Sequence, residues 1–159
     1  MSKFSYDKQE DQDRLVLYLK GHIDEDINFS EIDISNHKKI YINLKDIKSI
    51  NSCGIREWIR WLQTASPETQ FTFAQCPKII VDQINMVSGF LPEGAEVESF
   101  FVPYYCEETG NEKMILFEKG KEFKDGEVFP PEEVLDDETG DPMEMDVLEN
   151  KYFKFLKQG

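Results

Sequence analysis

Residues 39–62 read KIYINLKDIKSINSCGIREWIRWL, and this stretch decides the fold class. Its first part, residues 39–44, nearly alternates apolar and polar residues and is rich in β-branched and aromatic side chains, which predicts a strand. From Gly54 onward the apolar residues recur at helical spacing, and polar residues fill the other side. The apolar positions are Ile55, Trp58, Ile59 and Leu62. The stretch therefore predicts a strand, a turn at Ser52 and an amphipathic helix.

Outward from this stretch, strands and helices continue to alternate. Further strands are predicted over residues 14–19, 71–74 and 97–105 from their apolar and β-branched content. A second amphipathic helix is predicted after the Cys76-Pro77 pair, because proline is tolerated at the first helical position. This succession is typical of an α/β domain, a β-sheet covered by α-helices.

Beyond residue 105 the character of the chain changes. Apolar segments at residues 114–117 and 127–129 flank a stretch rich in lysine and glycine, which predicts a small β-hairpin. An acidic stretch over residues 132–146 then precedes an aromatic terminus. We therefore divide the chain into a domain over residues 1–105 and an acidic C-terminal appendage over residues 106–159.

Composition limits the function classes. The chain has 159 residues, of which 40% are hydrophobic, so one folded core is expected. The net charge of -14 repels the phosphates of nucleic acids and anionic membrane surfaces, so neither is an expected partner. There is no apolar run as long as a signal peptide or a membrane span, and the three cysteines have no disulfide-like spacing. We therefore expect a cytoplasmic protein.

Three segments carry a family resemblance: the Gly21-x-Ile23-Asp24 strand end, the strand over residues 40–44, and the turn Ile47-x-x-Ile50-Asn51-Ser52-Cys53-Gly54-Ile55. Together they resemble the STAS family, the bacterial anti-sigma factor antagonists and their relatives. The resemblance covers residues 14–103 and implies a mixed β-sheet covered by α-helices. It also implies a non-enzymatic signalling module that binds a protein partner, an anti-sigma factor or a related serine-kinase-like regulator.

The resemblance also implies a functional surface around the turn. Ser52 matches the position that a partner kinase phosphorylates in the antagonists, while Asn51 replaces the usual Asp and Cys53 the usual Ser or Thr. The partner-binding residues that the resemblance implies are Asp24, Glu25, Asp26, Asn51, Ser52, Cys53, Gly54 and Arg56.

Ser52 has three possible roles at this point. Its position before the helix also suits a purely structural N-cap, whose hydroxyl accepts from amides of the first turn. The alternatives are therefore a regulatory serine, a helix cap, and a position that binds a partner without being phosphorylated.

A second, separate resemblance lies in the appendage. The segments beginning at Cys106 and Asp136 resemble the two halves of a zinc ribbon, with Thr109, Asp136 and Thr139 at places where cysteines would stand. Structural zinc needs about four Cys or His ligands, so we predict no metal here. Apolar burial would then hold the hairpin, through Phe117, Phe129, Tyr152, Phe153 and Phe155.

The sequence gives little sign of catalysis. Only two histidines occur, His22 and His37, and there is neither a glycine-rich phosphate loop nor a metal-ligand cluster. We therefore predict a protein that is not an enzyme and uses no cofactor. Its predicted function is partner binding with Ser52 as the candidate phosphorylation site. The alternative is a scaffold that assembles independently of phosphorylation through the same surface and the acidic appendage.

Overall fold

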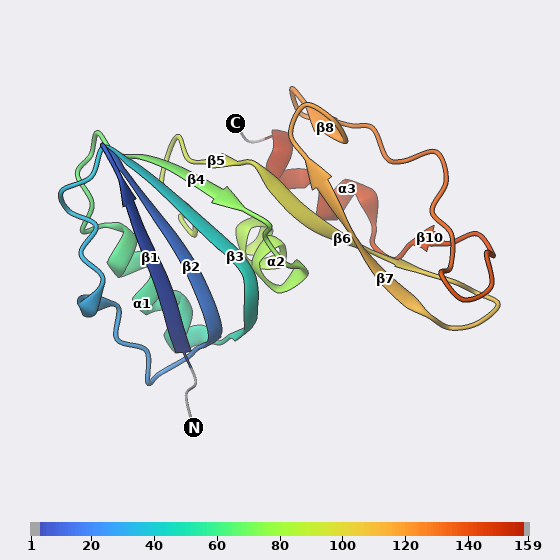
Figure 1. Cartoon of the computed structure of the whole chain (residues 1–159), viewed down its shortest axis with the longest axis horizontal. Helices are drawn as coiled ribbons and strands as arrows, with labels where there is room; N and C mark the ends of the chain where they lie inside the picture. Colours follow the sequence, from blue (N-terminus) through green and yellow to red (C-terminus); the bar gives the residue numbers. More distant parts are fainter. Residues whose placement is uncertain (1–3, 158–159) are drawn as a thin grey trace.

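The computed structural model describes residues 4–157. It contains a five-stranded sheet with helices beside it and a second, smaller group of strands next to it (Figure 1). In chain order the elements are β1 (Phe4–Asp11), β2 (Arg14–Ile23), η1 (Phe29–Glu31), β3 (Lys39–Ile50), α1 (Ser52–Leu62), β4 (Gln70–Ala74), α2 (Lys78–Met86), β5 (Glu96–Val97), β6 (Ser99–Tyr105), β7 (Glu112–Glu118), β8 (Phe123–Lys124), β9 (Glu127–Val128), β10 (Glu144–Met145), α3 (Glu149–Tyr152) and η2 (Lys154–Lys157).

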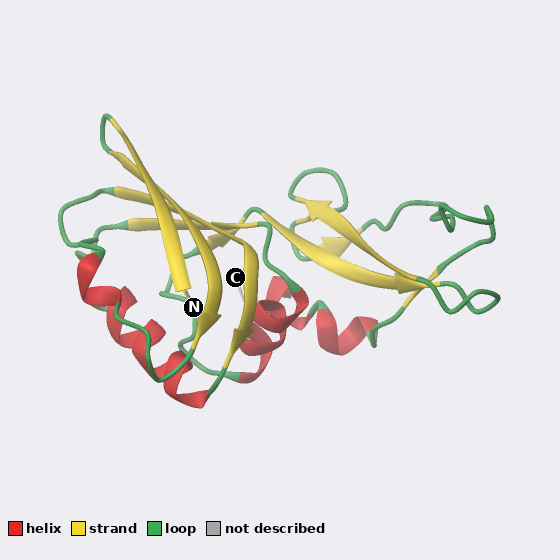
Figure 2. Cartoon of the chain, turned by 60° about the horizontal axis from the view of Figure 1, so that its bottom comes forward, coloured by secondary structure: helices red, strands yellow, loops and turns green. Residues whose placement is uncertain are grey.

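The main sheet has the strand order β1-β2-β3-β4-β5 and is mixed. β1 runs antiparallel to β2, and the four strands β2 to β5 run parallel to one another. Parallel neighbours need a crossover, which α1 supplies between β3 and β4 and α2 between β4 and β5. Both helices lie on the same face of the sheet (Figure 2). The predicted α/β class, with a mixed sheet and helices, is confirmed.

The core lies between this sheet and its helices. Along β3 the side chains of Ile40, Ile42 and Leu44 are fully buried, whereas the alternate residues Tyr41 and Asn43 are only half-buried on the other face. This is the period of two that an amphipathic strand requires.

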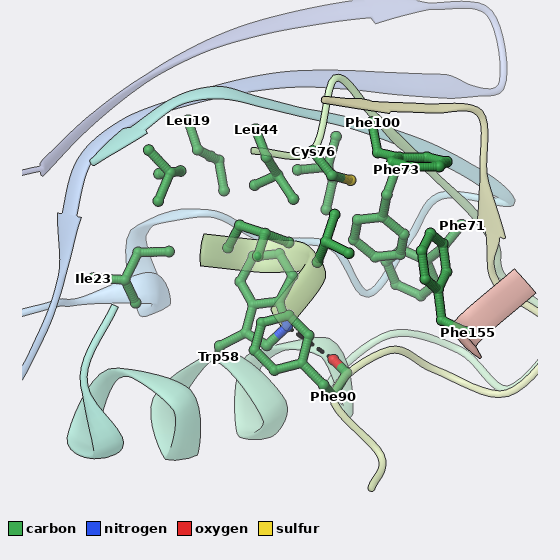
Figure 3. Close-up of a cluster of buried hydrophobic side chains, with 14 of the residues drawn as sticks. Leu19, Ile23, Leu44, Trp58, Phe71, Phe73, Cys76, Phe90, Phe100 and Phe155 are labelled. Carbon is green, nitrogen blue, oxygen red and sulfur yellow. Dashed lines mark hydrogen bonds between the residues drawn. The ribbon is translucent and has the colours of Figure 1, made fainter. Parts of the chain in front are cut away.

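Trp58 of α1 lies at the centre of the core (Figure 3). It is fully buried, its ring centroid is 5.5 Å from that of Phe90, and its Nε1 donates to the Phe90 carbonyl oxygen at 2.9 Å. Trp61, three residues further along α1, is also buried. Its ring stacks on Phe29 at 4.5 Å, and its Nε1 donates to the Ile32 carbonyl oxygen at 2.9 Å.

The main sheet extends further toward the N-terminus than the sequence predicted. β1 was missed because most of its residues are polar. Six of its eight residues are exposed and only Phe4 and Tyr6 pack partly against the core. As an edge strand it is held by pairing with β2 along its whole length, so it needs no amphipathic pattern.

The strand predicted over residues 97–105 is two strands. β5 completes the main sheet, and after Glu98 the chain turns into β6, which pairs antiparallel with β7 and β10 in a second sheet. An isolated β-bridge between Cys76 and Phe100 joins β6 to the segment between β4 and α2. The fully buried Phe100 ring contacts five aromatic rings of the C-terminal appendage: Phe117, Phe123, Tyr152, Phe153 and Phe155.

The predicted pairing of residues 114–117 with 127–129 is wrong. β7 pairs with β6 instead, because a tight turn joins them and seven-residue pairing places Phe117 opposite Phe100. Residues 127–128 pair with 123–124 in a short hairpin. Of the five aromatic residues expected to hold this region by burial, four are buried, but Phe129 is 51% exposed.

The C-terminal segment is attached to α2. The Asn85 side chain donates to the Tyr152 carbonyl oxygen and accepts from the Phe155 amide, both at 2.9 Å. The Tyr152 hydroxyl donates to the Phe101 carbonyl oxygen at 2.5 Å. Within residues 4–157, none of the helices has the length and apolar character needed to cross a membrane.

Candidate functional site: the turn before helix α1

Asn51, not Ser52, caps α1. Its backbone is extended, with φ of -110° and ψ of -179°, and its side-chain oxygen accepts from the Gly54 amide at 2.9 Å. Ser52 is already the first helical residue. The alternative in which Ser52 is the N-cap is therefore wrong, because the helix begins one residue earlier than that role requires.

The loop after β2 lies against this turn, as the sequence predicted. The Asn51 side-chain nitrogen donates to Glu25 Oε2 at 2.8 Å. Inside the loop, the Asp26 amide donates to Asp24 Oδ1 at 3.0 Å, which links the first and third of its three acidic residues. One asparagine side chain thus caps the helix and holds the acidic loop beside it.

Gly54 lies beneath the turn rather than on its surface. A Cβ atom at this position would be 2.0 Å from the Ile23 carbonyl oxygen and 2.5 Å from the carbonyl carbon. The same carbonyl oxygen accepts from the Asn51 amide at 3.2 Å. Gly54 is buried, so it cannot itself offer a side chain to a partner. It allows the start of α1 to approach the end of β2.

The side chains offered to solvent are those of Ser52 and Cys53, and one helical turn further on that of Arg56. Residues four apart are neighbours on a helix surface, so Ser52 and Arg56 share one face of α1. Of the eight residues grouped by sequence, only Gly54 is buried. Asp24 is half-buried, and the others are exposed around the turn.

Asn51→Ala is expected to reduce the free energy of unfolding by about 1 kcal/mol, because it removes the helix cap. Asn51→Asp keeps an oxygen that can accept from the Gly54 amide, but it loses the donor to Glu25 and places two carboxylates together. We expect Asn51→Asp to retain most of the stability while loosening the acidic loop. Urea unfolding measures the first effect, and amide hydrogen exchange over residues 24–26 measures the second. Equal stability of wild type and Asn51→Ala would contradict the capping role.

The two segments that resemble ribbon halves do meet in the structure. Asp136 Oδ2 accepts from the Thr109 hydroxyl at 2.6 Å, and the Asn111 side-chain nitrogen lies 3.1 Å from the same oxygen. Cys106 lies beside the Asp136 carboxylate and is a further, smaller cause of its lowered pKa. Asp136 is only 4% exposed and Cys106 is fully buried. The structure thus places a hydrogen-bonded carboxylate at the junction of the two halves, a group we call the clasp: Cys106, Thr109, Asn111 and Asp136.

The clasp lowers the pKa of Asp136. The hydrogen bond from Thr109 is the largest cause, and the Glu138 amide and the Asn111 side chain add to it, taking the pKa from 3.8 to about 2. Each of these donors stabilises the charged form. The sequence pattern had placed Asp136 only at a position where a zinc-ribbon cysteine would stand. It missed Asn111, which lies in the turn after Thr109 and matches no ligand pattern.

This pKa shift gives Asp136 an acid-dependent contribution to stability. Because the pKa is lower in the folded chain than in the unfolded one, the contribution is fully present above about pH 4 and is lost as the pH falls through about 2. The urea midpoint of wild type should therefore exceed that of Asp136→Asn near neutral pH, with the difference vanishing at the acid end. Asp137→Asn is the matched control, because the Asp137 side chain is 81% exposed and should show little difference at any pH. A pH-independent gap for Asp136→Asn would contradict this.

The cysteines show no sign of a shared chemical role. All three are free thiols, with Cys53 exposed and Cys76 buried beside the helix α2 start. Burial raises the pKa of the Cys76 thiol to about 12, so it is held as the neutral thiol. Across residues 4–157, no group of three or more His, Cys, Asp or Glu side chains is placed to hold a metal ion.

The sequence has no match among models of known protein families or among curated proteins.

Proposed function

We propose that this protein is a non-enzymatic signalling module whose partner-binding surface is the turn before α1 with the acidic loop beside it. The observation that carries the proposal is the rigid presentation of two exposed side chains. Ser52 and Cys53 lie in the first turn of a helix fixed from below by the Gly54–Ile23 contact and from the side by Asn51. A surface that is both exposed and pre-ordered binds a partner with little loss of conformational entropy.

We further propose Ser52 as a phosphorylation switch for this surface. The first amides of an α-helix have no partner within the helix and lie at the positive end of its dipole, which favours a phosphate there. Arg56, on the same face, supplies a cation within one helical turn. A phosphate adds about -1.5 to -2 charges and would repel Glu25, which Asn51 holds next to this turn. Phosphorylation would thereby displace the acidic loop and change the surface that a partner contacts.

The kind of partner comes from the resemblance to the STAS family. It is a cytoplasmic protein of the anti-sigma factor or serine-kinase-like class, and the charge of -14 argues against nucleic acid and membrane surfaces. This choice of partner rests on the turn sequence and its position between a strand and an amphipathic helix.

Affinity capture from the native cell with tagged full-length variants tests the proposal. We expect a partner that wild type and Ser52→Ala retain, and whose recovery falls at least about tenfold for Ser52→Glu and Arg56→Glu. Lys124→Glu is the matched control, because it makes the same charge change on an exposed residue of β8 outside the turn. Mass spectrometry of the captured, tagged wild-type protein should find phosphate on Ser52. Equal recovery by Arg56→Glu and wild type would contradict binding at the turn.

One observation favours the scaffold alternative. The appendage carries apolar side chains that solvent reaches, with Met114 47%, Phe129 51% and Leu148 65% exposed. Such residues suit a constitutive second contact. A partner retained equally by wild type, Ser52→Ala and Ser52→Glu but lost on Arg56→Glu would favour this scaffold over the phosphorylation switch.

A further inference from the structure

The two turns that form the clasp have the same backbone geometry. In the first, the Gly110 amide donates to the Cys106 carbonyl oxygen at 2.7 Å and the Cys106 amide donates to that of Asn111 at 2.9 Å. In the second, the Gly140 amide donates to the Asp136 carbonyl oxygen and the Asp136 amide to that of Asp141, both at 2.8 Å.

The side chains repeat as well. The Thr109 hydroxyl accepts from the Asn111 amide at 3.1 Å, and the Thr139 hydroxyl accepts from the Asp141 amide at 3.2 Å. Gly110 and Gly140 share the left-handed backbone, with φ of 76° and 75°. Residues 106–111 and 136–141 are therefore two copies of one turn, each with its first and fourth residues in equivalent positions.

Two such turns facing each other are the frame of a tetrahedral structural zinc site, in which each turn supplies two thiolates at Cys-x-x-Cys spacing. Here the first position of the second turn is Asp136, whose carboxylate accepts from the Thr109 hydroxyl and the Asn111 side-chain nitrogen of the first turn. The fourth positions hold threonines. The contacts that would converge on an ion converge instead on one carboxylate.

We infer that the clasp is a metal-site frame in which the hydrogen-bonded Asp136 carboxylate takes the place of the ion. Placing cysteines at positions 109, 136 and 139 beside Cys106 would then create a tetrahedral site for a thiophilic divalent cation. The inference concerns the appendage alone and is independent of the function proposed for the turn before α1. In wild type, the carboxylate joins the two turns without metal. The negative charge of the Asp136 carboxylate is stabilised there by the Thr109 hydroxyl, the Asn111 side-chain amide and the Glu138 backbone amide.

Titration of the full-length triple variant Thr109→Cys/Asp136→Cys/Thr139→Cys with Co²⁺ under reducing conditions tests the inference. We expect one Co²⁺ per chain, with the intense visible absorption of a tetrahedral thiolate site, displaced by Zn²⁺. The melting temperature of the variant should rise on adding Zn²⁺, whereas that of wild type should not change with Zn²⁺ or with a chelator.

Two controls separate the frame from the mere presence of thiols. Glu108→Cys/Asp137→Cys/Glu138→Cys has as many cysteines at neighbouring exposed positions and should give no tetrahedral spectrum. Adding Cys106→Ser to the triple variant should weaken Co²⁺ binding at least about tenfold. A triple variant that folds without binding Co²⁺, or that stays unfolded in the presence of Zn²⁺, would overturn the inference. One equivalent of zinc in purified wild type would overturn it too.

Discussion

Gly54→Ala should destabilise this protein by about 2 kcal/mol or more, although glycine to alanine normally stabilises a helix by about 1 kcal/mol. The reason for the reversed sign is the Ile23 carbonyl group, whose oxygen would lie 2.0 Å from the new Cβ atom. Both clashing atoms are backbone atoms, so no side-chain rotation relieves the contact. The start of α1 must move away from the end of β2, which also weakens the Asn51–Ile23 hydrogen bond.

Urea unfolding with circular dichroism measures this effect, and the melting temperature should fall by about 4–8 °C. Cys53→Ala is the matched control, because it lies one residue away in the same helical turn but is exposed. Its stability should stay within about 0.5 kcal/mol of wild type. Equal stability of Gly54→Ala and wild type would show that α1 does not approach β2 this closely.

Trp58→Ala should have the largest effect on stability, about 3–5 kcal/mol. The side chain is fully buried, and its ring lies within 6.2 Å of those of Phe29, Trp61, Phe73 and Phe90. Its removal leaves a cavity between the sheet and α1, and a whole domain of this size is stable by only about 5–15 kcal/mol. We expect this variant to be largely unfolded at moderate urea concentrations that leave wild type native.

Trp58→Phe separates the hydrogen bond from the packing. It keeps an aromatic ring but loses the donor to the Phe90 carbonyl oxygen, so we expect an intermediate cost of about 1–3 kcal/mol. Met86→Ala is the control on an exposed apolar side chain, 70% exposed, and should change stability little. A loss for Trp58→Ala no larger than that for Met86→Ala would contradict the placement of Trp58 at the centre of the core.

The main sheet could be predicted from sequence because its signals are local. The alternation in β3 and the helical spacing of apolar residues in α1 are visible in short windows, and each is enforced by burial on one face. β1 lacked such a signal because an edge strand is stabilised mainly by backbone pairing. The predicted pairing in the appendage was wrong because several apolar segments there could serve as strand partners. The buried Phe100 of β6 packs against Phe117 and Phe155, which are distant from it in sequence, and short sequence windows do not show such contacts.

The candidate site was predicted in outline but not in detail. The turn and the acidic loop were expected to be neighbours, and the Asn51–Glu25 contact joins them. Asn51 is the helix cap in place of Ser52 because α1 begins at residue 52. Asparagine and serine are both good N-cap residues, so their propensities alone do not determine where the helix begins. The roles of Gly54 and Asn111 depend on the three-dimensional approach of two backbones or two turns, for which the sequence carries no direct signal.

Photo-cross-linking in the native cell is the most direct test of binding at the turn. Benzoylphenylalanine would replace the exposed Cys53 in one variant and the exposed Phe129, in the appendage, in another. The proposed function predicts a discrete adduct with one protein from position 53, its loss when Ser52→Glu is added, and no such adduct from position 129. No adduct from position 53, or the same adduct in equal yield from both positions, would contradict it.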